Sequence, residues 1–203
     1  YLREGLAGDA DSQLRLGHII DAFGELETAN YWFEISASNG NIEAQSIMGT
    51  AYGVGKGVDK NQQVGLYWLK KSAQEGDAWA QNNLGTAYHN GTGVNKNLDQ
   101  AIYWYQLSSE QGNGMATRNL GSIYLTEFKD PVKAIHYFEQ AIELGAITAA
   151  WDIGYIYLNG VAGIEINENL AFEWMLSAAN SFYKHAEFEV SMMYLNGIGV
   201  EAN

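Results

Sequence analysis

The sequence predicts an all-α protein in which about five to six helix-turn-helix repeats stack into an α/α superhelical solenoid. Two sets of glycine, small and aromatic residues recur along the 203-residue chain, once every 32 to 37 positions. Within each copy the recurring positions lie three, four or five residues apart, which places them on one face of an α-helix. A period of this length is typical of stacked supersecondary units, and the single proline of the chain suits long helical runs.

The first recurring set marks one helix of each repeat, called helix A here. An apolar residue and a glycine are followed by an aromatic residue three positions after the glycine, and a small residue stands five positions before it. The copies are centred on Gly17, Gly49, Gly85, Gly121, Gly154 and Ser191. The first and last copies are weaker, because Ile20 takes the aromatic position in one and Ser191 replaces glycine in the other.

The second set marks the other helix, helix B, and reads small-x-x-Trp with a glycine eight positions after the tryptophan. The aromatic column is Trp32, Trp68, Trp104, Tyr137 and Trp174, and the closing glycines are Gly40, Gly76, Gly112 and Gly145. Phe182 stands where a fifth closing glycine would be. We expect the aromatic column to fill the space between repeats and the closing glycines to adopt a left-handed conformation.

These two sets predict a single repeat domain over residues 1–203. Its parts are a partial repeat at 1–8, repeats at about 9–40, 41–76, 77–112, 113–145 and 146–182, and a partial repeat at 183–203. The first part is expected to end a helix B, and the last to supply a sixth helix A. Because stacked repeats need neighbours or caps, we expect the parent protein to be longer.

The repeats resemble the Sel1-like repeats, which are relatives of the tetratricopeptide repeats. The resemblance rests on the loop Tyr-x-x-Gly-x-Gly-Val, present from Tyr52 and from Tyr88, and on the helix B pattern Ala-x-x-Trp-x-x-x-Ala-Ala-x-x-Gly. Repeats one and four lack the loop glycines, and Tyr137 and Ser191 depart from the pattern. The resemblance implies an adaptor, as in bacterial envelope and virulence factors, secretion-system immunity proteins and eukaryotic adaptors.

Composition and charge exclude several classes of protein. The formal net charge of −13 opposes nucleic-acid binding through a basic patch, and no apolar stretch approaches the length of a membrane span. The absence of cysteine removes disulfides, thiolate metal sites and cysteine nucleophiles. The charge is uneven, because residues 51–139 hold 8 acidic and 8 basic side chains while the flanking segments are acidic.

No catalytic site, metal site or cofactor is predicted. The four histidines lack ligand spacing, and no acidic pair stands out from a solvated face. The glycines around Lys56 are not followed by the Gly-Lys-Ser/Thr of a phosphate loop, and the segment from Asp59 lacks the glycine and terminal glutamate of a calcium loop. We interpret both segments as repeat turns.

In solenoids the first helices commonly line a concave face where partners bind. By analogy with tetratricopeptide repeats, we expect positions −6, −3, +1, +4 and +5 from the helix A glycine to face this groove. The candidate partner-binding residues are Trp79, Asn82, His89, Asn90, Arg118, Trp151, Tyr155, His185 and Phe188. Tryptophan, tyrosine and arginine are frequent interface hot spots. The alternative for Trp151, Tyr155 and Phe188 is packing against a further C-terminal helix.

The leading hypothesis is a non-catalytic protein–protein interaction scaffold whose partner is another protein. We expect a bacterial envelope or virulence role, with a periplasmic or secreted location favoured over a cytoplasmic one. One alternative is an immunity protein that neutralises a secreted toxin. Another is a peptide- or glycan-binding module, in which Trp79 and Trp151 stack on sugars, or a hydrolase.

Overall fold

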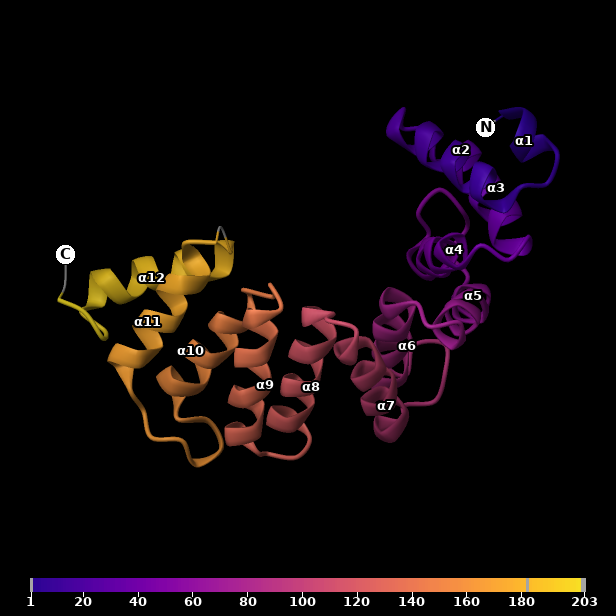
Figure 1. Cartoon of the computed structure of the whole chain (residues 1–203). Coiled ribbons are helices and arrows are strands. Elements are labelled where there is room, and N and C mark those ends of the chain that lie inside the picture. The colour runs from indigo at the N-terminus through magenta and orange to yellow at the C-terminus, as the bar shows by residue number, and fades with distance from the viewer. Residues whose placement is uncertain (1, 182, 202–203) are drawn as a thin grey trace. The chain divides into compact units, whose positions relative to one another are not determined.

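The computed structural model describes residues 2–181 and 183–201, and this part of the chain contains twelve α-helices, one short 3₁₀-helix and no β-strand (Figure 1). The α-helices are α1 (Leu2–Leu6), α2 (Ala10–Ala22), α3 (Leu26–Ser38), α4 (Ile42–Val54), α5 (Gln62–Gln74), α6 (Ala78–Asn90), α7 (Leu98–Glu110), α8 (Gly114–Thr126), α9 (Pro131–Glu143), α10 (Ala149–Asn159), α11 (Glu168–Ala179) and α12 (Lys184–Asn196). The 3₁₀-helix η1 (Val161–Gly163) follows α10. The prediction of an all-α fold is confirmed. Phe182 lies outside the described residues.

Helices A and B alternate along the chain as predicted. The helices A are α2, α4, α6, α8, α10 and α12, and the helices B are α3, α5, α7, α9 and α11. Each helix B packs against the helix A of its own repeat, and α1 packs against α2 where the end of a preceding helix B was expected. The chain forms two compact units, unit 1 (Tyr1–Gln111) and unit 2 (Gly112–Asn203).

Polar caps set the helix boundaries. Asp9, Asn41, Asp77 and Asn113 precede helices A, and Asn61, Asn97, Asp130 and Asn167 precede helices B. Each side chain accepts a hydrogen bond from the first helical turn, as asparagine and aspartate do at N-caps. The closing glycines of helices B have φ angles of +95°, +100°, +84° and +87° at Gly40, Gly76, Gly112 and Gly145, which confirms their predicted conformation.

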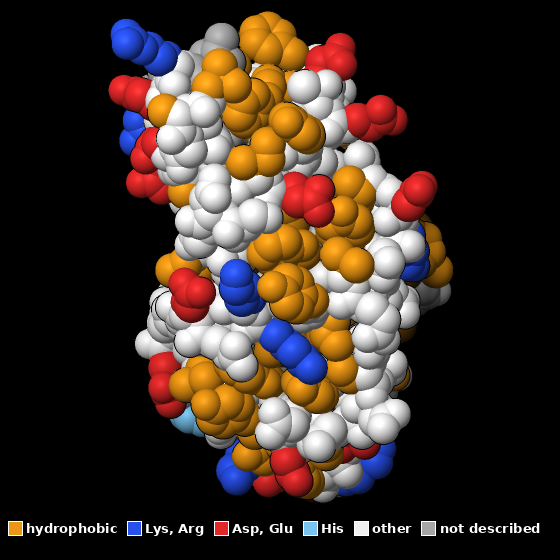
Figure 2. Space-filling view, turned by 90° about the vertical axis from the view of Figure 1, so that its right-hand side faces the viewer, with side chains coloured by type: hydrophobic (Ala, Val, Ile, Leu, Met, Phe, Trp, Pro, Cys, Tyr) orange, Lys and Arg blue, Asp and Glu red, His pale blue; other side chains and the backbone are white. Residues whose placement is uncertain are grey.

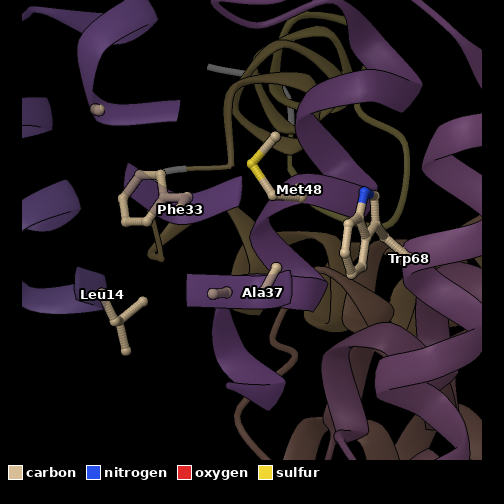
Figure 3. Packing of buried hydrophobic residues seen from close by; sticks show 7 residues of the cluster. Leu14, Phe33, Ala37, Met48 and Trp68 are labelled. Carbon is tan, nitrogen blue, oxygen red and sulfur yellow. The ribbon is translucent and has the colours of Figure 1, made fainter. Parts of the chain in front are cut away.

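Three tryptophans of the aromatic column, Trp68, Trp104 and Trp174, pack against the repeat before their own. Figure 3 shows Phe33 of α3, Met48 of α4 and Trp68 of α5, which belong to one cluster of buried side chains. Trp68 is 7% exposed. Trp104 of α7 packs against the cluster of α5 and α6, and Trp174 of α11 packs against the cluster of α9 and α10. At these three positions the column therefore fills the space between repeats, as predicted.

The helix A glycine packs against the residue that follows the aromatic column. The pairs are Gly17–Phe33, Gly49–Leu69, Gly85–Tyr105, Gly121–Phe138 and Gly154–Met175. At Gly85 an added Cβ would lie 2.7 Å from Cδ1 of Tyr105, a side chain that is 1% exposed. Close packing of helices A and B therefore requires glycine here. The helix B residues that pack against these glycines were not predicted, because their type changes from repeat to repeat.

Buried polar side chains also join the helices of unit 1. Ser36, Ser72 and Ser108 of helices B donate to backbone carbonyls at the start of helix A, at 2.7, 3.0 and 2.6 Å. Gln13, Gln45 and Gln81 of helices A donate through Nε2 to a carbonyl of the preceding helix. In unit 2 the matching positions hold Ala141 and Ala178 in place of serine, and Thr117, Ala150 and Glu187 in place of glutamine. Unit 1 thus uses buried hydrogen bonds where unit 2 has mostly alanine.

Candidate partner-binding site

Helices A of the first three repeats line a hollow of about 530 Å³ in unit 1, the acidic hollow. Its lining residues are His18, Asp21, Leu26, Asn30, Phe33, Glu43, Ser46, Ile47, Thr50, Ala51, Lys56, Asp77, Trp79 and Asn83. Six of them occupy the helix A positions that the sequence analysis expects to face a groove: His18, Asp21, Glu43, Ser46, Thr50 and Trp79. Asn30 and Lys56 were missed, because one belongs to helix B and the other to a loop.

Trp79 is the most exposed aromatic side chain at the acidic hollow. Its exposed fraction is 63%, whereas Phe33 in the same lining is 3% exposed. Asp77 caps α6 by accepting from the backbone N–H of Ala80 at 2.6 Å, so that Trp79 stands in the first turn of the helix. A large apolar side chain beside a hollow is the usual form of an interface anchor.

The charges at the acidic hollow are partly paired. His18 Nε2 lies 3.1 Å from Glu43 Oε1, and Lys56 Nζ lies 3.7 Å from Asp21 Oδ1. The side-chain amide of Asn30 donates to the backbone carbonyl of Lys56 at 2.7 Å, which helps to hold this loop against α3. With histidine counted as neutral, three carboxylates face one ammonium group, so the lining has a formal charge of 1 − 3 = −2. The hollow therefore favours a cationic group.

Three other predicted residues lie on α6 outside this lining. Asn82 is buried, and its amide donates to the side chain of Asn83 at 3.4 Å. His89 is half-buried and packs edge-on against Tyr105, with ring centroids 6.5 Å apart. Asn90 is exposed at the last position of the helix.

In unit 2, Arg118 of α8 forms a two-pronged ion pair with Asp152 of α10. Nε of Arg118 donates to Oδ2 and Nη2 donates to Oδ1 of the carboxylate. The side chains are 23% and 13% exposed. Burial raises the pKa of Asp152, and the Arg118 guanidinium offsets part of that rise. The guanidinium of Arg118 is therefore engaged within unit 2.

The aromatic candidates of unit 2 form a cluster that extends through Tyr183. Trp151 is half-buried, stacks on Tyr155 at 5.5 Å and meets Tyr183 edge-on at 6.4 Å. Tyr183 in turn contacts the ring of His185 at 5.6 Å. Tyr155, His185 and Phe188 are exposed, Phe188 to 65%. The described helices thus already cover part of Trp151, while the other three side chains reach the surface.

A second set of exposed aromatic residues lies on helices B of unit 1. Tyr31, Tyr67 and Tyr103 each directly precede the tryptophan column and pack edge-on against it, with ring centroids 5.0 to 5.7 Å apart. Their exposed fractions are 61%, 57% and 49%. The repeated Tyr-Trp pair is the sequence signal that predicts them. Figure 2 shows a face on which hydrophobic side chains extend over much of the surface, with charged side chains beside them.

Neither a metal-ion site nor a membrane-spanning helix is present within residues 2–181 and 183–201. No three histidine, cysteine, aspartate or glutamate side chains gather there in a way that could bind a metal ion. None of the helices described is both long and apolar enough to cross a membrane.

The model of the Sel1 repeat matches residues 10–41, 42–77, 80–113, 114–145, 147–181 and 184–203. The chain belongs to the Sel1 repeat family. Sel1 repeat proteins are in general non-catalytic scaffolds that bind other proteins. No curated protein matches the chain.

Solved Sel1 repeat structures share the fold. The chain is similar to c5321, a protective antigen of uropathogenic Escherichia coli strains, with 31% identity and a TM-score of 0.83 over 99% of this chain and 44% of that one. It is also similar to a Sel1 repeat protein from Oxalobacter formigenes, with 28% identity and a TM-score of 0.77 over 94% of this chain and 77% of that one. The chain thus spans less than half the length of the Escherichia coli protein.

A third solved structure shares the fold at lower identity. The immunity protein Pa5087 from Pseudomonas aeruginosa is 19% identical, with a TM-score of 0.61 over 87% of this chain and 67% of that one. This likeness concerns the fold alone.

Proposed function

We propose that this Sel1 repeat chain is a non-catalytic interaction scaffold whose protein partner docks on helices A around Trp79. The observation that carries the proposal is the 63% exposed indole of Trp79 beside a hollow of about 530 Å³. Tryptophan anchors that fill or border pockets commonly dominate binding energy. The general role of Sel1 repeats in binding proteins supports the same assignment.

We assign a second contact role to the exposed aromatic side chains of unit 2. Tyr155, His185 and Phe188 are accessible to a partner, whereas Trp151 is half-buried and stacked on Tyr155, and Arg118 is held by Asp152. In this proposal Trp151 and Arg118 position the surface, and the three exposed residues touch the partner. On α6, His89 and Asn90 extend the contact surface of unit 1 beyond Trp79.

The proposed setting is a bacterial envelope or virulence role, with a periplasmic or secreted location. The description of the 31% identical Escherichia coli protein as a protective antigen supports this setting. Fractionation of source cells, with the chain detected by antibody, tests the location. Recovery in the cytoplasmic fraction alone would contradict it.

The scaffold proposal is tested by comparing three immobilised proteins: the wild-type chain, Trp79→Ala and Tyr31→Ala. Tyr31 is a matched control, because it is 61% exposed on α3 and does not line the acidic hollow. Proteins captured from extracts of the source organism are quantified by mass spectrometry, and the captured partner is then titrated in purified form. We expect Trp79→Ala to lower affinity by about thirty-fold or more, the usual loss at a hot spot, and Tyr31→Ala to have little effect.

Thermal melts of the three proteins separate binding from folding. If Trp79→Ala folds like the wild type and still binds the partner at full strength, the partner docks elsewhere. The exposed tyrosines of helices B would then be the next surface to examine.

A further inference from the structure

We propose that the acidic hollow of unit 1 receives a lysine or arginine side chain of the partner, and that a second hollow beside it receives a neighbouring apolar side chain. This inference rests on the proposed function, because it names the chemistry of the partner at the same site. The partner segment is therefore basic and apolar in composition.

The charge of the lining selects a cation. Asp21, Glu43 and Asp77 contribute carboxylates, and Lys56 is the one ammonium group among the lining residues. Lys56 lies 3.7 Å from Asp21, Glu43 lies 3.1 Å from His18, and Asp77 caps α6, so neither Glu43 nor Asp77 has a lysine or arginine partner in the lining. An anionic segment would face a net negative site on a chain with a formal charge of −13.

The apolar part of the lining suits the stem of the same side chain. Leu26, Phe33 and Ile47 line the hollow together with the charged groups. Lysine and arginine bury their methylene stems against apolar surface and keep the charged head near polar groups. The exposed indole of Trp79 adds a ring face on which a guanidinium or ammonium group is attracted. A long cationic side chain satisfies all three features at once.

The second hollow, of about 220 Å³, shares Thr50 and Asn83 with the acidic hollow. These two side chains also lie within hydrogen-bond distance, at 3.4 Å from Nδ2 of Asn83 to Oγ1 of Thr50. The remaining lining includes Val54, Leu66 and Leu69 and carries no charged side chain. An apolar side chain adjacent to the cationic one would therefore enter this apolar hollow.

Gly53 lines the apolar hollow and gives the second repeat a residue without a side chain at this position. The matching positions in later repeats are His89, Leu125, Leu158 and Leu195. An added Cβ at Gly53 would meet no atom within 4 Å, and Gly53 does not have a positive φ. A leucine at this position is therefore compatible with the fold and would occupy the hollow.

The inference is tested with synthetic peptides and the ¹⁵N-labelled chain in NMR titrations. The probes are acetylated, amidated peptides that contain arginine and leucine separated by zero, one or two glycines. Matched peptides carry citrulline, an uncharged analogue of arginine, or glycine in place of leucine. We expect saturable shifts of the Trp79 indole N–H, identified from the spectrum of Trp79→Phe, and at least ten-fold weaker binding of the citrulline peptide.

Charge-neutral variants localise the effect. Glu43→Gln keeps the side-chain length, and Asp77→Asn keeps an N-cap residue on α6. We expect each variant to bind the arginine peptide about five-fold more weakly, because a carboxylate near the cation is lost. Glu110→Gln, an exposed position outside both hollows, is the control and should leave the affinity for the arginine peptide unchanged. Gly53→Leu should lower the affinity for the arginine–leucine peptide and leave the affinity for the arginine–glycine peptide unchanged.

The outcomes separate this inference from the proposed function. Equal binding of the arginine and citrulline peptides, or no saturable shift at Trp79 with any spacing, would overturn the cationic site. If the Gly53→Leu variant binds the arginine–leucine peptide as tightly as the wild type does, the assignment of the apolar hollow is overturned. If the natural partner depends on Trp79 but not on Glu43 or Asp77, the scaffold proposal stands and the cationic assignment falls.

Discussion

Arg118 and Asp152 are 34 residues apart in sequence, yet Nε and Nη2 of the arginine donate to the two carboxylate oxygens of the aspartate. The pair joins α8 to α10, the helices A of two successive repeats. Both side chains are mostly buried. A candidate binding residue is thereby part of the internal structure of unit 2.

Replacement of Arg118 by methionine should destabilise unit 2 by about 2–4 kcal/mol, because a mostly buried carboxylate loses its partner. Urea denaturation followed by circular dichroism measures the loss. The double variant Arg118→Met, Asp152→Leu should recover much of it, since no charge is then left unpaired. Equal stability of the wild type and Arg118→Met would show that the pair contributes nothing.

The same variant should show a specific pH dependence. Burial already raises the folded-state pKa of Asp152, and removal of Arg118 takes away the group that offsets this rise. When the pKa of a carboxyl is raised in the folded state, protonation of that carboxyl stabilises the fold. The loss of unfolding free energy caused by Arg118→Met should therefore be largest at neutral pH, where Asp152 is charged. It should shrink as the pH falls towards roughly 4, near the ordinary pKa of aspartate. A loss that stays constant from pH 7 to that value would contradict this account.

Glu75→Gln should stabilise unit 1 by about 1 kcal/mol. Asn39 and Gln111, which follow α3 and α7, donate to the side-chain oxygens of Gln13 and Gln81 at 2.8 Å. Glu75 occupies the matching position after α5, and Oε1 of Gln45 is buried without a hydrogen-bond partner. An ionised carboxylate cannot donate, whereas glutamine can.

The control for this substitution is Glu110→Gln, which also removes a carboxylate near the C-terminal end of a helix. Both variants relieve the unfavourable interaction with the helix dipole, so the difference between them reports the new hydrogen bond. Equal melting temperatures of the two variants would mean that no such bond forms.

Replacement of two helix A glycines by alanine should change the free energy of unfolding in opposite directions. Gly85→Ala should cost about 1–3 kcal/mol, because the new Cβ overlaps the buried ring of Tyr105. Gly53→Ala should stabilise by up to about 1 kcal/mol, because it gains helix propensity where the Cβ meets open space. Chemical denaturation of both variants checks the contrast. The same sign of change in both would contradict the packing described here.

Two tryptophans should differ in their contribution to stability. Trp68→Ala should cost about 3–5 kcal/mol, since a 7% exposed ring in the core is removed. Trp79→Ala should cost less than about 1 kcal/mol, because this ring is 63% exposed. Thermal melts compare them directly, and equal losses would identify Trp79 as a core residue. Trp104→Ala is expected to behave like Trp68→Ala, because Trp104 packs against the buried cluster of α5 and α6.

The candidate site was predictable in part. The positions of His18, Glu43 and Trp79 at the acidic hollow follow from their offsets to the helix A glycines, since these offsets determine which face of a helix a side chain occupies. The burial of Asn82 does not follow from such an offset, because it depends on how closely the neighbouring helices approach. For the same reason the sequence does not reveal that Gly53 borders a hollow while the helix A glycines Gly49 and Gly85 are covered by Leu69 and Tyr105.

The sequence by itself determined the helices, their pairing into repeats and the turns between them, as the left-handed glycines and the buried Trp68 illustrate. These features depend on residues within a few turns of one another, so periodicity and turn chemistry specify them. Only the tertiary structure decided that Arg118 pairs with Asp152 and that Trp79 stays exposed beside acidic side chains. The physical reason is that these environments are built by side chains from different repeats, brought together by helix packing at distances in sequence that no local pattern encodes.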